Sequence, residues 1–199
     1  GCLRNQVFVA STGVIGEPLP LNRLTRAMPQ MVEALAPGWW GAAARAICTT
    51  DTFIKGAWRR CEIDSHEITL GGIAKGSGMI APNMGTMLAF LFTNARIPSA
   101  ALQAMLRASV ETSFNSITVD SDTSTSDTVL LVATDRSNHP PLNSPHDPKL
   151  RDFRRALDEV MVELATQVVR DGEGASKFVT IEVSGASSWR MARRVGLSI

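Results

Sequence analysis

The sequence has few cysteines, no long apolar stretch and no block of like charge. Three cysteines occur among 199 residues, Cys2, Cys48 and Cys61, and none forms a Cys-x-x-Cys pair. This odd count argues against a disulfide framework and against zinc, and it favours a reducing, cytoplasmic location. No apolar run reaches the roughly 18 residues that a membrane span needs. The net charge of +1 gives no reason to expect nucleic acid or an anionic membrane as a partner.

The sequence also lacks the patterns of common metal sites and of histidine-based catalysis. No set of His, Cys and carboxylate residues has metal-ligand spacing, so we expect no metal. The acidic segment 120–127 departs from the calcium-binding loop, which needs glycine and glutamate where this chain has Thr125 and Leu131. None of the three histidines lies near a serine or cysteine in a recognisable motif. Segment 120–127 is therefore a self-capping loop or a support for a nearby site.

Mixed periodicities predict an α/β protein, and the length suits one large domain or two small ones. Apolar residues at helical spacing predict helices over 21–35, 42–48, 100–114 and 151–170. Alternating or solidly apolar segments predict strands over 6–10, 57–63, 67–70, 87–92, 129–133 and 178–184. Because the predicted strands and helices do not alternate regularly as βαβ units, we expect a layered α/β sandwich and not a doubly wound sheet.

A threonine stands where a Gly/Pro-rich segment meets an apolar strand. Residues 75–85 contain three glycines and a proline, and the apolar run begins directly after Gly85 and Thr86. A threonine whose own amine is free can act as a nucleophile with a built-in base. We therefore interpret the Gly85–Thr86 bond as a self-cleavage site that divides the chain into residues 1–85 and 86–199, with Thr86 as the nucleophile.

Three further segments contain candidate site residues, each with a plainer alternative. Thr12 and Gly13 follow a predicted strand and could stabilise an oxyanion, or they could form an ordinary strand-end turn. Lys75 precedes the glycines, so it does not fit a phosphate loop. It could bind a carboxylate or be a solvated side chain. Glu173 closes the last predicted long helix, where the loop could cap the helix or contact a ligand.

Eight ordered blocks together resemble one family. They are VASTGVIG (9–16), TTDT (49–52), IAKGSGMIAPNM (73–84), TML (86–88), NSITVD (115–120), DTST (122–125), DTVLL (127–131) and DGEG (171–174). In this order they resemble the ornithine acetyltransferases, the bifunctional glutamate N-acetyltransferases of arginine biosynthesis. The family fold is an α/β sandwich. Its members are longer at both ends, and this sequence likewise lacks an initiator methionine and ends within an apparent element.

The resemblance implies a mechanism with named residues. Thr86 would take acetyl from N-acetylornithine and pass it to glutamate, with Thr12 and Gly13 as the oxyanion hole. The amino-acid substrate would contact Thr49, Lys75, Thr86 and Glu173, with Lys75 on its carboxylate. No cofactor is implied, although acetyl-CoA could serve as another acetyl donor. The two products of cleavage would stay together in a heterotetramer.

Two other functions are compatible with the same residues. An amidase or aminopeptidase would keep the Thr86 nucleophile and pass the acyl group to water. A truncated, inactive domain would need missing segments before it could fold. Transfer of acetyl to glutamate distinguishes the acetyltransferase from both.

Overall fold

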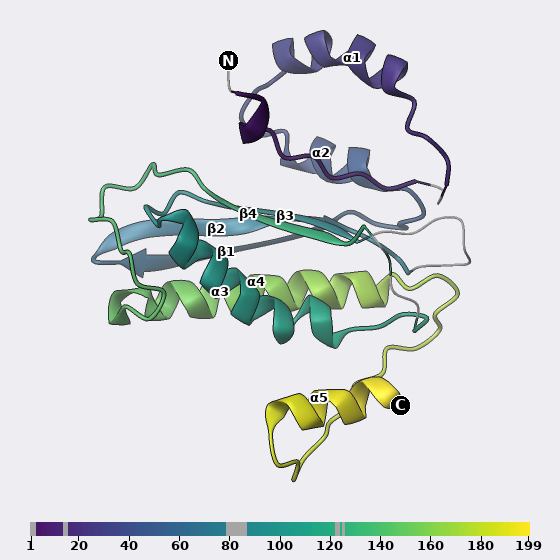
Figure 1. The fold of residues 1–199 in the computed structure, drawn as a ribbon, viewed down its shortest axis with the longest axis vertical. Coiled ribbons are helices and arrows are strands. Elements are labelled where there is room, and N and C mark those ends of the chain that lie inside the picture. The colour runs from purple at the N-terminus through teal and green to yellow at the C-terminus, as the bar shows by residue number, and fades with distance from the viewer. Residues whose placement is uncertain (1–2, 14–15, 79–86, 122–123, 125) are drawn as a thin grey trace.

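A four-stranded sheet with helices on both faces forms the centre of the chain (Figure 1). The structure is a computed structural model that describes residues 3–13, 16–78, 87–121, 124 and 126–199. The strands are β1 (Lys55–Ile63), β2 (His66–Lys75), β3 (Leu88–Thr93) and β4 (Thr128–Ala133), in the order β1-β2-β3-β4. The first three are antiparallel, and β4 runs parallel to β3. The predicted mixed α/β class is confirmed.

Helices lie on both sides of this sheet. They are α1 (Leu21–Glu33), α2 (Trp40–Ile47), α3 (Ser99–Glu111), α4 (Arg151–Arg170) and α5 (Trp189–Ser198), with short 3₁₀ helices at Arg4–Gln6, Phe114–Ser116 and Pro148–Leu150. Helices α3 and α4 cover one face and α2 lies on the other, while α1 and α5 lie farther out on opposite sides (Figure 1). The predicted helix over 151–170 is confirmed with the same bounds, because its buried apolar residues recur at helical spacing.

The two predicted strands over 57–63 and 67–70 are confirmed as β1 and β2, which form a hairpin. Asp64 and Ser65 form a two-residue turn with φ values of 50° and 64°, the left-handed conformation that matches the twist of paired strands. Both strands are longer than predicted: β1 begins at Lys55, and β2 continues to Lys75. This extension matters, because it brings both lysines to the same end of the sheet, where Lys55 pairs with Ala74.

Two predicted strands are wrong. Residues 6–10 and 178–184 carry strand-like patterns, but neither segment pairs with the sheet, and most of their side chains are exposed. A strand is stable only when a neighbour completes its backbone hydrogen bonds. Strand β4 is formed as predicted, but it is half-exposed instead of buried because it lies at the sheet edge.

Gly72 provides a test of how tightly β2 packs against β3. A Cβ added at Gly72 would lie 2.1 Å from the Phe90 carbonyl oxygen, whereas one added at Gly56 would meet nothing closer than 3.6 Å. We expect Gly72→Ala to lower the free energy of unfolding by roughly 1–3 kcal/mol, the usual cost of overpacking. Gly56→Ala should change it by no more than about 0.5 kcal/mol. Denaturant unfolding of the full-length protein measures both, and equal stabilities would contradict the packing described.

Candidate functional site

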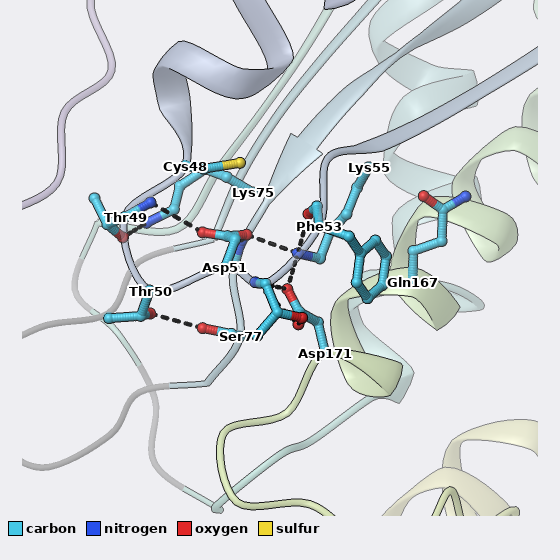
Figure 2. Close-up of polar contacts among 12 residues, drawn as sticks. Cys48, Thr49, Thr50, Asp51, Phe53, Lys55, Lys75, Ser77, Gln167 and Asp171 are labelled. Atoms are coloured by element: carbon cyan, nitrogen blue, oxygen red, sulfur yellow. Dashed lines mark hydrogen bonds and ion pairs between the residues drawn. The ribbon is translucent and has the colours of Figure 1, made fainter.

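Four segments meet at the end of the sheet where β2 stops (Figure 2). Lys75 is the last residue of β2 and is followed by the Gly76–Gly78 loop, while Lys55 begins the adjacent strand β1. The loop between α2 and β1 contributes Cys48 through Asp51, and the end of α4 contributes Asp171. These residues come from distant parts of the chain, and hydrogen bonds join them.

Lys55 lies between two buried carboxylates. Its Nζ is 2.7 Å from Asp51 Oδ1 and 2.5 Å from Asp171 Oδ2, and all three side chains are at most 1% exposed. The backbone N–H and the hydroxyl of Thr52 also donate to Asp171. Charges this deeply buried are stable only when they are paired and hydrogen-bonded. We call Asp51, Lys55 and Asp171 the ion cluster.

Asp51 also accepts hydrogen bonds from the backbone on two sides. Its Oδ1 accepts from the Gly76 N–H at 2.7 Å, and its Oδ2 accepts from the Thr49 N–H at 3.2 Å. Burial raises the pKa of this carboxyl, but the hydrogen bonds from Gly76, Lys55 and Thr49 outweigh that effect, and the pKa lies below its ordinary value. Asp51 is therefore ionised at neutral pH.

The ammonium group of Lys75 has a neutral partner. Lys75 is 1% exposed, and its Nζ donates to the Thr49 hydroxyl at 2.9 Å. Within the described part of the chain, no carboxylate forms an ion pair with it. Burial lowers the pKa of Lys75, and the nearby charge of Asp51 opposes that effect. A buried cation beside a hydroxyl suits an anionic ligand such as a carboxylate. We call Lys75 and Thr49 the Lys75–Thr49 pair.

Glu173 adjoins the same end of the sheet through the backbone. Its N–H donates to the Ser77 carbonyl oxygen at 2.8 Å, and the Ser77 hydroxyl lies 2.7 Å from that of Thr50. The Glu173 side chain is exposed. The structure thus joins two sequence-predicted site residues, Lys75 and Thr49, directly, and it links Glu173 to their loop through Ser77.

The other sequence-predicted site residues are not brought into this network. Thr12 and Gly13 lie in an extended segment before α1, and no hydrogen bond between the described residues connects them to the Lys75–Thr49 pair. The placement assigned to these two residues, an oxyanion hole next to the nucleophile, stays a prediction. Gly85 and Thr86 lie outside the described residues, so the cleavage site and nucleophile also stay predictions.

Met87, the residue after Thr86, lies against the loop that follows Lys75. A Cβ added at Gly76 would lie 3.5 Å from Met87 Cα. The Met87 N–H donates to Asp127 Oδ1 at 2.9 Å, and its carbonyl accepts from the Thr128 N–H at 3.0 Å. A cavity of about 540 Å³ opens here, lined in part by Gly76, Met87 and Asp127. The cavity could hold a small amino-acid derivative.

Sequence reasoning missed the residues that organise this end of the sheet. Lys55 was not singled out at all, and Asp171 was considered only as part of a helix-ending loop. The one local signal is the four-residue spacing of Asp51 and Lys55, which is uninformative in a loop.

In the part of the chain that the structure describes, no group of three or more His, Cys, Asp or Glu side chains could hold a metal ion. No described helix is long and apolar enough to cross a membrane.

Comparison with known proteins gives a consistent result. The model of the ArgJ family matches residues 1–199. The arginine biosynthesis bifunctional protein ArgJ of Rhizobium meliloti is 50% identical over 202 residues, and its counterpart from Caulobacter vibrioides is 50% identical over 198 residues. Each comparison covers 100% of this chain and 49% of the relative, so the chain spans about half the length of these curated relatives. The crystal structure of the Bacillus halodurans ArgJ protein is 38% identical, with a TM-score of 0.41, over 46% of this chain and 41% of that chain.

Proposed function

The chain belongs to the ArgJ family, and from that premise we propose that it forms part of an acetyltransferase of arginine biosynthesis. The enzyme moves acetyl from N-acetylornithine to glutamate. The observation that carries this proposal is the buried Lys75–Thr49 pair, which lies beside the loop packed against Met87. A group suited to a substrate carboxylate is thereby close to the residue that follows the nucleophile, Thr86.

The enzyme first activates itself by cutting the Gly85–Thr86 bond. The Thr86 hydroxyl attacks the Gly85 carbonyl carbon, the peptide nitrogen takes up a proton, and an ester replaces the amide. Water hydrolyses this ester, which leaves a carboxylate on Gly85 and a free amine on Thr86. Glycine before the cleaved bond has no Cβ to hinder this rearrangement. Residues 1–85 then belong to the end of one chain and residues 86–199 to the start of a second, and the pairing of β2 with β3 holds the two together in one α/β sandwich.

Acetyl transfer follows in two half-reactions. The Thr86 hydroxyl attacks the acetyl carbonyl of N-acetylornithine while its amine accepts the hydroxyl proton. The ornithine amine leaves with a proton, and an acetyl ester remains on Thr86. The amine of glutamate attacks this ester, forms N-acetylglutamate and restores the hydroxyl. Thr12 and Gly13 stabilise the negative oxygen in both steps, and no cofactor is needed.

Charged and polar side chains among the described residues bind the two ends of the substrate. Lys75 and Thr49 bind its carboxylate, and the exposed carboxylate of Glu173 attracts the side-chain amine of ornithine. We further propose acetyl-CoA as a second acetyl donor, a heterotetramer of the two chains as the assembly, and the cytoplasm as the location.

Incubation of the purified full-length protein with N-acetylornithine and glutamate tests the proposal. We expect ornithine and N-acetylglutamate in equal amounts, and a fragment beginning at Thr86 that gains the mass of one acetyl group when glutamate is omitted. Ornithine release without N-acetylglutamate would establish an amidase instead. A single uncut species without transfer would overturn the acetyltransferase proposal.

Replacement of Lys75 by methionine tests the carboxylate site. The substitution removes the charge and keeps the length of the side chain, so it should mainly weaken binding. A hydrogen bond to a charged group contributes about 1.5–3 kcal/mol, which corresponds to a roughly 10- to 150-fold rise in KM. The same substitution at Lys149, whose ion pair with Asp64 is exposed, should leave KM unchanged. An unaltered KM in Lys75→Met would contradict the assigned role.

A further inference from the structure

A single buried carboxylate contacts both segments of the Lys75–Thr49 pair. We propose that Asp51 is a positioning residue that fixes Lys75 and Thr49 at the separation needed to bind a substrate carboxylate. This inference rests on the function proposed above, and it assigns Asp51 a role in affinity without any contact with the substrate.

The hydrogen bonds of Asp51 reach the pair from both sides. Its Oδ2 accepts from the Thr49 N–H, so it fixes the backbone that presents the Thr49 hydroxyl to Lys75. Its Oδ1 accepts from the N–H of Gly76, the residue directly after Lys75. Among the described residues, Asp51 is the only side chain that accepts from both backbones. A shift of this carboxylate would therefore move both members of the pair.

The rest of the ion cluster orients Asp51 in turn. Lys55 donates to Asp51 Oδ1 and also to Asp171, which caps the end of α4. Lys55 is the first residue of β1 and Asp171 directly follows α4, and both elements pack in the core. The position of Asp51 is thus set by a strand and a helix of the core, and Asp51 in turn positions the loop segments around Thr49 and Gly76.

The charges around Lys75 balance only while Asp51 is ionised. The ionisable groups that act on Lys75 are Asp51 and Cys48, which favour its charged form, and Lys55, which opposes it. Together, Lys55 and Lys75 match Asp51 and Asp171 in number. Because burial already lowers the pKa of Lys75, loss of the Asp51 charge would lower that pKa further. A neutral Lys75 would no longer attract a carboxylate.

Asparagine at position 51 separates this role from simple space-filling. The amide has the shape of the carboxylate, and its oxygen can still accept from Lys55 and Gly76. Its Nδ2 would then face the Thr49 N–H, so two donors would oppose each other. The loss of one charge and one acceptor should therefore loosen the Thr49 side of the pair first.

Kinetics of the full-length Asp51→Asn protein test the proposal. We expect KM for N-acetylornithine to rise about tenfold, the effect of a roughly 1.4 kcal/mol loss, with kcat much less affected. Binding of N-acetylornithine should also weaken as the pH rises and Lys75 loses its proton. This weakening should begin at a lower pH in Asp51→Asn than in the wild type. The matched control is Asp64→Asn, which removes an exposed ion pair at a position whose positive φ suits asparagine. A wild-type KM and pH profile in Asp51→Asn would overturn the proposal.

A titration that needs no activity distinguishes this proposal from the proposed function. The Cε resonance of Lys75 in lysine-labelled protein, assigned by its loss in Lys75→Met, should titrate at a lower pH in Asp51→Asn than in wild type. If the wild type transfers no acetyl, the proposed function fails, and this shift alone decides the role of Asp51. An unchanged titration would overturn it.

Amide hydrogen exchange covers the case in which Asp51→Asn does not fold. In the wild-type protein, the Thr49 and Gly76 N–H groups donate to the two oxygens of one carboxylate, so movement of Asp51 releases both. Their protection should therefore be similar and should fall together as acid protonates Asp51. Fast exchange at Thr49 beside a protected Gly76 would overturn the proposal.

Discussion

Replacement of Thr86 by alanine is expected to abolish both self-cleavage and acetyl transfer. The alanine protein has no hydroxyl to form either ester, so the chain should remain uncut and unacetylated. Loss of the nucleophile costs on the order of 10⁶ in kcat in a serine protease, which also acts through an ester intermediate. Mass analysis under denaturing conditions measures both outcomes, because it separates the intact chain from its fragments and detects an added acetyl group.

Two controls make this experiment specific. Thr86→Ser keeps a hydroxyl and should retain some cleavage, since serine can form the same ester. Thr25→Ala removes an exposed hydroxyl on α1 that donates only to nearby helical carbonyls, so cleavage and transfer should be unchanged. Cleavage of Thr86→Ala at the same bond would show that another group attacks it, and the threonine mechanism would be wrong.

The fixed position of Met87 supports the choice of Thr86. Asp127 and Thr128 bind the Met87 backbone on both sides, and Met87 lies against Gly76. A nucleophile attached to a held residue loses little freedom when it reacts, which is how positioned groups accelerate a step. Segment 120–127, for which the sequence left a self-capping loop or a site support open, thus contributes one residue that holds the neighbour of Thr86.

Elements with a local signal could be predicted from the sequence. Helix α4 carries its apolar face within 20 consecutive residues, so its bounds followed from periodicity alone. The turn at Asp64 and Ser65 lies between two strand-like runs and likewise needs no distant partner to be recognised. Segments 6–10 and 178–184 show the limit, because their strand pattern gives no information on whether a neighbouring strand is available.

The ion cluster could not be predicted, because its partners are far apart in the chain. Lys55 and Asp171 are separated by 116 residues, and nothing in the sequence links a strand start to a helix end. Lys75 and Thr49 were proposed together only through a family resemblance, which placed them on one substrate without any geometry. That Asp51 joins the backbones of Thr49 and Gly76 is visible only in the folded chain.

Replacement of Lys55 by methionine is expected to be the most destabilising substitution in this region. Asp51 and Asp171 would lose the cation they share while both remain buried. Breaking a buried ion pair by removing one partner typically costs about 3–5 kcal/mol, because an uncompensated charge remains inside the protein. Denaturant unfolding of the full-length protein should show a loss of this size in the free energy of unfolding.

The matched control for this loss is Arg59→Met. Arg59 also bridges two carboxylates, Glu159 and Glu163 at 2.8 Å each, but its side chain is 36% exposed. Water screens such pairs, so we expect a change of no more than about 1 kcal/mol. Equal losses in the two variants would show that burial does not decide the strength of the Lys55 contacts.

Acid unfolding gives a second readout with a definite sign. The pKa of Asp51 lies below its ordinary value, so its ionised form contributes stability above that ordinary value and loses it as the pH falls through the folded pKa. Lys55 is one of the groups that lower this pKa, so Lys55→Met should begin to lose stability at a higher pH. Adding Asp171→Asn removes one of the two uncompensated charges, and it should therefore restore part of the lost stability. Recovery of stability in this double variant would separate charge repulsion from lost packing, because the second substitution fills no space that Lys55→Met leaves empty.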